Sequence, residues 1–122
     1  MGLRRLKQSF ANAGMGLWQV VREEQSFRIQ LVFTAIVVVL MLVFPLSALE
    51  RLILVMVIIS VLVLEIINSI FERIVDVYKP RLNPYVRDIK DMMAAAVLIV
   101  SIGATIIGLM IFVPHIADFW IR

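Results

Sequence analysis

The chain has 122 residues, of which 62% are hydrophobic, and a net charge of +3. This apolar fraction lies far above the roughly 45–50% of soluble domains, and three apolar runs leave little chain for a separate soluble core, so we expect one membrane domain over residues 1–122. The absence of cysteine excludes disulfides, zinc–thiolate sites and thiol nucleophiles. The basic residues stand at the ends of apolar segments, which indicates membrane orientation and not nucleic-acid binding.

Residues 1–27 predict an amphipathic helix lying on the membrane surface. Leu3, Leu6 and Phe10 keep helical spacing while the basic residues occupy other sides. Trp18 suits the headgroup level. A plain surface anchor explains the same periodicity, and that alternative stays open. We expect no cleavable signal peptide, because the first apolar run begins only after about two dozen mostly amphipathic residues.

Three apolar runs predict three transmembrane helices, over residues 28–45, 48–77 and 89–113. Pro80 and Pro84 indicate a polar cytoplasmic loop over residues 78–88, because proline disfavours a continuous helix. Pro114 is expected to end the third helix. His115, which follows it, is expected to be a solitary exposed residue.

The positive charges predict the orientation of these helices. Most lysines and arginines precede the first span or surround the second loop, namely Arg4, Arg5, Lys7, Arg22, Arg28, Arg73, Lys79, Arg81, Arg87 and Lys90. Only Arg51 and Arg122 fall on the other side. Because cytoplasmic loops carry the excess of positive charge, the N-terminus and the second loop are expected in the cytoplasm.

The second predicted helix carries an unusual polar stripe. Each residue of a helix is rotated by about 100° from the one before it, so five polar side chains lie within roughly 60° of the direction of Glu65 around the helix axis. They are Glu65, Asn68, Ser69, Glu72 and Asp76. A charged residue near the bilayer core costs at least about 2.5 kcal/mol, so such residues usually mark function. Three carboxylates on one stripe repel each other, and a divalent cation is the simplest way to neutralise them. Ordinary pairing of Glu72 and Asp76 with Arg73 or Lys79 remains the alternative.

Two further polar groups are expected at the same membrane level. Glu24 follows Glu23 just before the first span, and Lys90 and Asp91 begin the third. Carboxylates with room for water and phosphate suit Mg²⁺, and a lysine supplies a point charge for phosphate. Together they indicate a site for a magnesium nucleotide, to which Arg5 would add a second positive charge. Glu65 lies about 16 Å deeper than Asp76, where a lipid alcohol is the accessible proton donor.

Three motifs on this chain occur together. They read Glu65-x-Ile67-Asn68-Ser69-x-x-Glu72-x-x-Val75-Asp76, Glu24-x-x-Phe27-Arg28 and Lys90-Asp91-x-x-Ala94-x-Ala96-Val97-Leu98. This set resembles the signature of the prokaryotic diacylglycerol kinase family, small integral-membrane lipid kinases that include undecaprenol kinases. The resemblance implies an all-α homotrimer in the bacterial cytoplasmic membrane, with a surface helix, three transmembrane helices per chain and active sites shared between subunits at the cytoplasmic face.

The resemblance also implies roles for individual residues. Glu65 would be the general base on the lipid hydroxyl, and Glu24 and Glu72 would hold Mg²⁺ on the ATP phosphates. Nucleotide contacts are implied for Arg5, Glu24, Glu72, Asp76, Lys90 and Asp91, and support or substrate contacts for Asn68, Ser69, Phe27 and Arg28. Gln30 and Asn83 depart from the family pattern, which leaves the choice of lipid open.

The expected function is therefore ATP- and Mg²⁺-dependent phosphorylation of diacylglycerol to phosphatidic acid. Undecaprenol is the alternative acceptor, and the pattern Gly108-x-x-Ile111-Phe112-x-Pro114 leans slightly towards it. From another class, a non-enzymatic oligomeric pore or assembly protein would also place a polar stripe along a channel.

Overall fold

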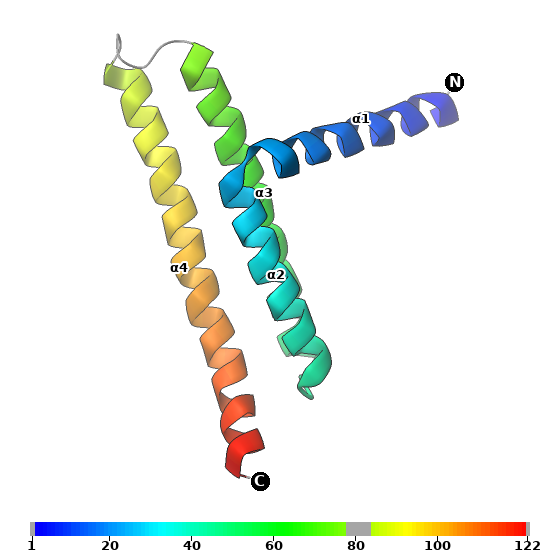
Figure 1. Cartoon of the computed structure of the whole chain (residues 1–122), viewed down its shortest axis with the longest axis vertical. Coiled ribbons are helices and arrows are strands. Elements are labelled where there is room, and N and C mark those ends of the chain that lie inside the picture. The colour runs from blue at the N-terminus through cyan, green and yellow to red at the C-terminus, as the bar shows by residue number, and fades with distance from the viewer. Residues whose placement is uncertain (1, 78–83, 122) are drawn as a thin grey trace.

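A computed structural model describes residues 2–77 and 84–121, which form four helices (Figure 1). They are α1 (Gly2–Glu23), α2 (Gln25–Val43), α3 (Ala48–Val77) and α4 (Pro84–Ile121). The all-α prediction is confirmed, and α2, α3 and α4 are each long and apolar enough to cross a membrane. The helix predicted over residues 48–77 is α3 itself.

The last helix differs from its predicted bounds at both ends. It begins at Pro84, inside the predicted loop 78–88, and continues through Pro114 to Ile121. Proline is well tolerated in a first helical turn, where its missing N–H has no partner to lose. Membrane helices also accommodate internal prolines better than soluble ones, so the prediction that Pro114 ends the helix is wrong. Residues 78–83, including Asn83, lie outside the described residues.

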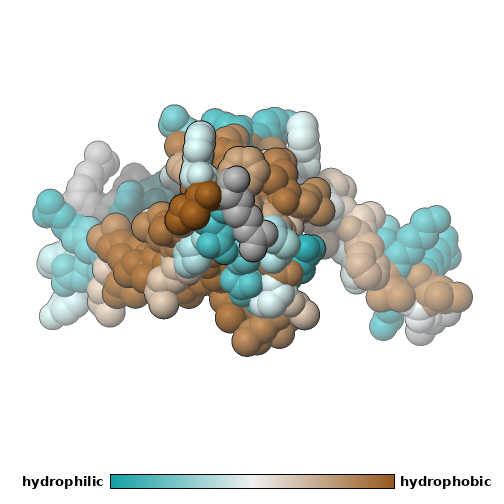
Figure 2. Space-filling model, turned by 90° about the horizontal axis from the view of Figure 1, so that it is seen from below, coloured by the Kyte–Doolittle hydropathy of each residue, from teal (hydrophilic) through white to brown (hydrophobic). Residues whose placement is uncertain are grey.

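The helices form an open bundle with one arm. In Figure 1, α3 and α4 run side by side, α2 lies against α3, and α1 projects to the side. A small core of Leu46, Leu54, Ile111 and Phe112 closes the end where α2 turns into α3, and the rings of Phe44 and Phe112 lie 6.3 Å apart there. Outside this core Phe27, Val61 and Val75 are buried and most of the other large apolar side chains are exposed. Figure 2 shows apolar side chains spread over the surface seen from that end.

The start of α3 is fixed by a reciprocal capping box. The Glu50 backbone N–H donates to Ser47 Oγ (3.1 Å), and the Ser47 backbone N–H donates to Glu50 Oε1 (3.0 Å). His115 Nε2 of α4 lies 3.2 Å from Glu50 Oε2. The prediction of a solitary exposed His115 is therefore wrong, since the histidine is half-buried and ties α4 to the first turn of α3.

Candidate active site

Glu65 lies buried in the second half of α3. Its side chain and that of Ser69 are each 4% exposed, and they are the buried polar residues of the described chain. Ser69 Oγ donates to the Glu65 backbone carbonyl (3.0 Å), so the buried hydroxyl finds its hydrogen-bond partner one turn earlier on the same helix. The Gln30 side chain, on α2, is in hydrogen-bonding contact with the Glu65 carboxyl. Sequence reasoning had treated Gln30 only as a departure from the family pattern.

Two further carboxylates lie near Glu65. Glu72 and Glu24 are both close enough to interact electrostatically with its carboxyl. Glu72 Oε1 accepts a hydrogen bond from Asn68 Nδ2 (3.4 Å), which holds it along the stripe. The structure therefore brings together the three glutamates that the sequence singled out, two from α3 and one from the corner between α1 and α2.

The corner that carries Glu24 is built by its neighbours in sequence. Glu24 itself is extended (φ −106°, ψ 108°) and separates α1 from α2. Phe27 is 2% exposed and anchors the corner in the bundle. Arg28 Nη1 donates to the carbonyls of Val21 (3.0 Å) and Arg22 (2.7 Å), which satisfies the open end of α1. Phe27 and Arg28 thus shape the backbone around Glu24.

Arg73 is a site neighbour that the sequence did not identify. Its Nη2 forms an ion pair with Glu23 Oε2 and lies 3.4 Å from Glu24 Oε1. The hydrogen bond from the Arg73 guanidinium lowers the pKa of the Glu23 carboxyl below its ordinary value. Pairing of Arg73 with Glu72 or Asp76 is therefore wrong, because the guanidinium turns to the α1–α2 corner. The sequence shows only an arginine directly after Glu72, and this position alone does not predict which carboxylate Arg73 pairs with.

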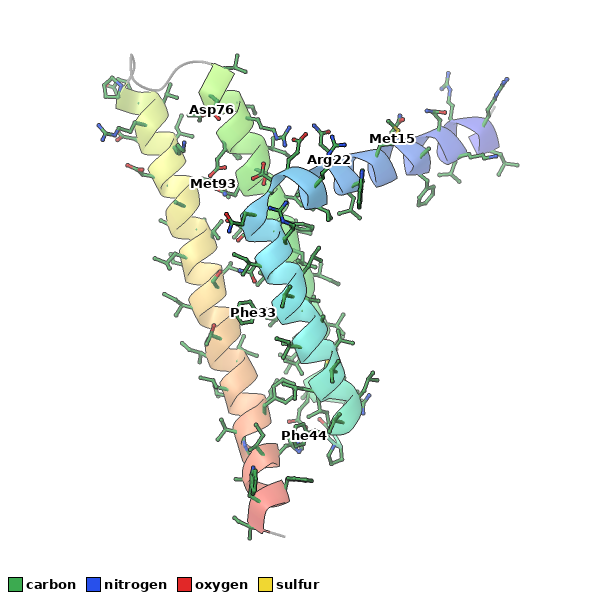
Figure 3. The ribbon with its side chains drawn as sticks, viewed as in Figure 1. Met15, Arg22, Phe33, Phe44, Asp76 and Met93 are labelled. Carbon is green, nitrogen blue, oxygen red and sulfur yellow. The ribbon has the colours of Figure 1, made fainter. Side chains whose placement is uncertain are left out.

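The other predicted nucleotide residues on α3 and α4, Asp76, Lys90 and Asp91, are exposed in the single chain. Figure 3 shows Asp76 near the end of α3 and Met93 on α4, and Asp76 is exposed. A cavity of about 230 Å³ between α3 and α4 is lined by Phe71, Ile89, Met92, Met93 and Ala96. Asp91, at about 200° around the helix from Ile89, lies on the opposite side of α4 from this cavity, and Lys90, at about 100°, lies at its side.

Arg5 is the most distant of the predicted site residues. It lies 18 positions before Glu23 on a continuous helix, about 27 Å along the axis. Its side chain is exposed on the projecting arm. A single chain therefore does not bring Arg5 to the three glutamates.

The acidic cluster fits a divalent cation only in part. Within residues 2–77 and 84–121 no group of three histidine or carboxylate side chains is gathered as a complete metal site. Mg²⁺, however, commonly takes one or two protein carboxylates and completes its shell with water and substrate phosphates. The oxygen donors of Glu24 and Glu72 suit such a site, and no softer ligand competes there.

These features define a multi-pass membrane protein with an acidic site built into its helices. The family model for prokaryotic diacylglycerol kinase matches residues 11–112. Undecaprenol kinase of Bacillus subtilis (strain 168) is 32% identical over 114 residues, which cover 93% of each chain. The chain belongs to the prokaryotic diacylglycerol kinase family.

Family membership confirms the resemblance and makes the protein a lipid kinase, so the pore or assembly alternative is set aside. It also implies ATP and a divalent metal ion as reaction partners. Arg5 lies before the matched range, so the family model adds no support for its role.

Proposed function

We propose that the protein transfers the γ-phosphoryl group of ATP, as its Mg²⁺ complex, to the hydroxyl of a lipid alcohol held in the bilayer near the cytoplasmic surface. The observation that carries this proposal is Glu65, a carboxyl buried in a membrane helix beside two other glutamates. A buried carboxyl at that depth is accessible to a membrane-borne hydroxyl and suited to general-base chemistry.

In the proposed phosphoryl transfer, each of the three glutamates has a role. Glu65 accepts the hydroxyl proton as the lipid oxygen bonds to the γ-phosphorus, and the bond from that phosphorus to the β–γ bridging oxygen breaks, which releases ADP. Glu24 and Glu72 would hold Mg²⁺, which supplies charge neutralisation for the phosphates when bound. Asn68 keeps Glu72 in place through its 3.4 Å hydrogen bond.

The site is proposed to be completed by a second subunit of a homotrimer. Among residues 2–77 and 84–121 no lysine is paired with the three glutamates, whereas Lys90 and Asp91 are exposed on α4. A rotationally symmetric trimer places the same pair of different surfaces together at every interface. Lys90 and Asp91 would then contact the nucleotide across the interface, and Asp76 would contact it from the same α3 as Glu72. Arg5 would reach it from the arm of another chain.

The arm α1 is proposed to lie in the cytoplasmic membrane interface. Within Gly2–Glu23 no residue is buried, and Leu3, Phe10 and Trp18 are 85%, 70% and 62% exposed. Such apolar side chains are stabilised in the headgroup region. Together with the charge distribution along the chain, this exposure supports our proposal that the N-terminus and the active site lie on the cytoplasmic side of the bacterial inner membrane.

Undecaprenol is the acceptor that we propose to test first. The full-length relative from Bacillus subtilis is an undecaprenol kinase, and the Gly108 to Pro114 pattern points the same way. Diacylglycerol, the acceptor expected from the sequence, is the second candidate, because the matching family model carries that name.

The test offers both lipids at equal mole fraction to the purified protein in bicelles with Mg²⁺ and ATP, and quantifies each phosphorylated lipid. We expect a single dominant product that disappears when EDTA replaces Mg²⁺. Absence of both products from folded protein would contradict the proposed function. Equal use of the two lipids would contradict a preference for undecaprenol.

A further inference from the structure

Arg73 connects two parts of the chain that are distant in sequence. It lies on α3, 50 positions after Glu23, and its guanidinium contacts both glutamates of the α1–α2 corner. Among the described residues, these are the ion pairs that join the corner to α3. Arg28, by contrast, bonds only to carbonyls of the preceding helix and leaves the orientation of the corner towards α3 open.

Packing between α1 and α3 is loose at this point. A cavity of about 390 Å³ separates them, lined by Gly16, Leu17 and Val20 of α1 and by Ile66, Ile70 and Arg73 of α3. Interdigitated side chains normally fix the angle between two helices. Where they are missing, directional polar contacts have a larger influence on that angle, and Arg73 supplies them at the edge of the cavity.

We propose that Arg73 is a positioning residue that docks the α1–α2 corner against α3 and keeps Glu24 beside Glu65 and Glu72. Glu23 takes the closer contact with the guanidinium, and Glu24 takes the longer one at 3.4 Å. The less exposed Glu24 (23%, against 39% for Glu23) thus remains available to a cation. This inference rests on the proposed metal-binding role of Glu24 and Glu72.

The expected consequence is a change in metal affinity. An exposed ion pair by itself adds little to stability, so Arg73→Ala should leave the protein folded. It should weaken Mn²⁺ binding, measured by EPR on the purified protein with a non-hydrolysable ATP analogue, by roughly ten-fold, as is usual when a contact that orients a metal ligand is lost. Turnover at saturating Mg²⁺ should fall much less than Mg²⁺ affinity.

Four variants make the test specific. Arg22→Ala is the matched control, because Arg22 also contacts Glu23 (3.6 Å) but does not reach α3; it should change the Mn²⁺ affinity less than about two-fold. Arg73→Lys keeps the charge and should retain most of the affinity. The exchange Glu23→Arg with Arg73→Glu should recover affinity that Glu23→Arg alone loses.

Distances supply a readout independent of catalysis. The chain has no cysteine, so spin labels on cysteines introduced at Phe10 and Val77, both strongly exposed, report the angle between α1 and α3. Arg73→Ala should broaden this distance distribution, and Arg22→Ala should not. Unchanged Mn²⁺ affinity and an unchanged distribution in Arg73→Ala would overturn the inference. Tighter Mn²⁺ binding would also overturn it, because Arg73 would then be a competitor for Glu24.

The two proposals fail in different ways. Wild-type protein that binds Mn²⁺ and shows the expected distances, but phosphorylates neither lipid, would contradict the proposed function alone. Wild-type protein that phosphorylates lipid while Arg73→Ala and Arg22→Ala behave alike would contradict only the docking role of Arg73.

Discussion

Glu65 is held by contacts from two helices. Its carboxyl lies near the Gln30 side chain of α2 and interacts electrostatically with the negative charges of Glu24 and Glu72. Ser69 Oγ does not contribute, because it donates its hydrogen bond to the Glu65 backbone carbonyl. We therefore propose that Gln30, a neutral neighbour of the Glu65 carboxyl, orients the proposed general base. Its amide adds no further charge to a segment where charge is costly.

Removing the Gln30 amide should lower catalysis selectively. We expect Gln30→Leu, which preserves volume but not the hydrogen bond, to reduce kcat by roughly ten-fold while the KM for ATP changes little, because a misoriented base slows only the chemical step. Steady-state kinetics with varied ATP measures both constants. A raised KM with unchanged kcat would instead place Gln30 in substrate binding.

Glu72 should matter for the metal and not for the proton. We expect Glu72→Gln to raise the Mg²⁺ concentration for half-maximal turnover by at least about ten-fold, since an anionic oxygen ligand is replaced by a neutral one. A Mg²⁺ titration of the initial rate measures this shift. Titration curves that superimpose on the wild type would show that Glu72 does not bind the metal.

The helices follow from local patterns to different degrees. Residues 48–77 were predicted as one helix because the apolar run is long. The Ser47–Glu50 capping box that starts this helix was not part of the prediction and is seen only in the structure. The bounds of α4 were missed, because rules for proline derive mainly from soluble helices and Pro84 and Pro114 are both accommodated. The boundary between the surface helix and the first span was predicted at residues 27 and 28, whereas the structure breaks the helix at Glu24. The prediction missed that Arg28 reaches back to the end of α1.

The capping box at Ser47 should contribute to stability without affecting the active site. We expect Ser47→Ala to destabilise the protein by about 1 kcal/mol, measured as a lower midpoint of SDS unfolding, with lipid phosphorylation unchanged at saturating substrate.

Ser60→Ala is the matched control for this prediction. Ser60 Oγ donates to the Met56 carbonyl (2.8 Å) on the same helix. Because Ser60 lies inside the helix and not at its end, removing its hydroxyl should cost little stability. Equal midpoints for the two variants would contradict a special role for the capping box.

At the scale of the whole molecule, one chain has a largely apolar exterior and, in our proposal, a site that a second subunit completes. Ile99 on α4 is 70% exposed and Met56 on α3 is 60% exposed, as expected for surfaces that face lipid or another subunit. Helical spacing predicted that Glu65 and Glu72 share one stripe, and the position of Glu24 just before the first span predicted the same membrane level for it. The sequence did not predict Arg73, since its pairing depends on the angle between α1 and α3, which no local pattern encodes.

A site shared between subunits predicts complementation. We expect Glu65→Gln and Lys90→Ala to be inactive separately, and their co-assembly from equal amounts of unfolded chains to restore about one quarter of wild-type activity, because each shared site needs one intact residue from each of two neighbours. Refolded mixtures assayed beside each variant alone provide the measurement. Mixtures as inactive as the separate variants would indicate that each site forms within one chain.

The most direct measurement is phosphoryl transfer from Mg²⁺-ATP to undecaprenol or diacylglycerol by Glu65→Gln in bicelles, with Glu50→Gln as the same substitution at the opposite end of α3. We predict that Glu65→Gln loses at least about a hundred-fold in rate, the usual contribution of a general base, while nucleotide binding and assembly persist and Glu50→Gln stays near wild type. A Glu65→Gln protein that phosphorylates lipid at the wild-type rate would contradict the proposed chemistry.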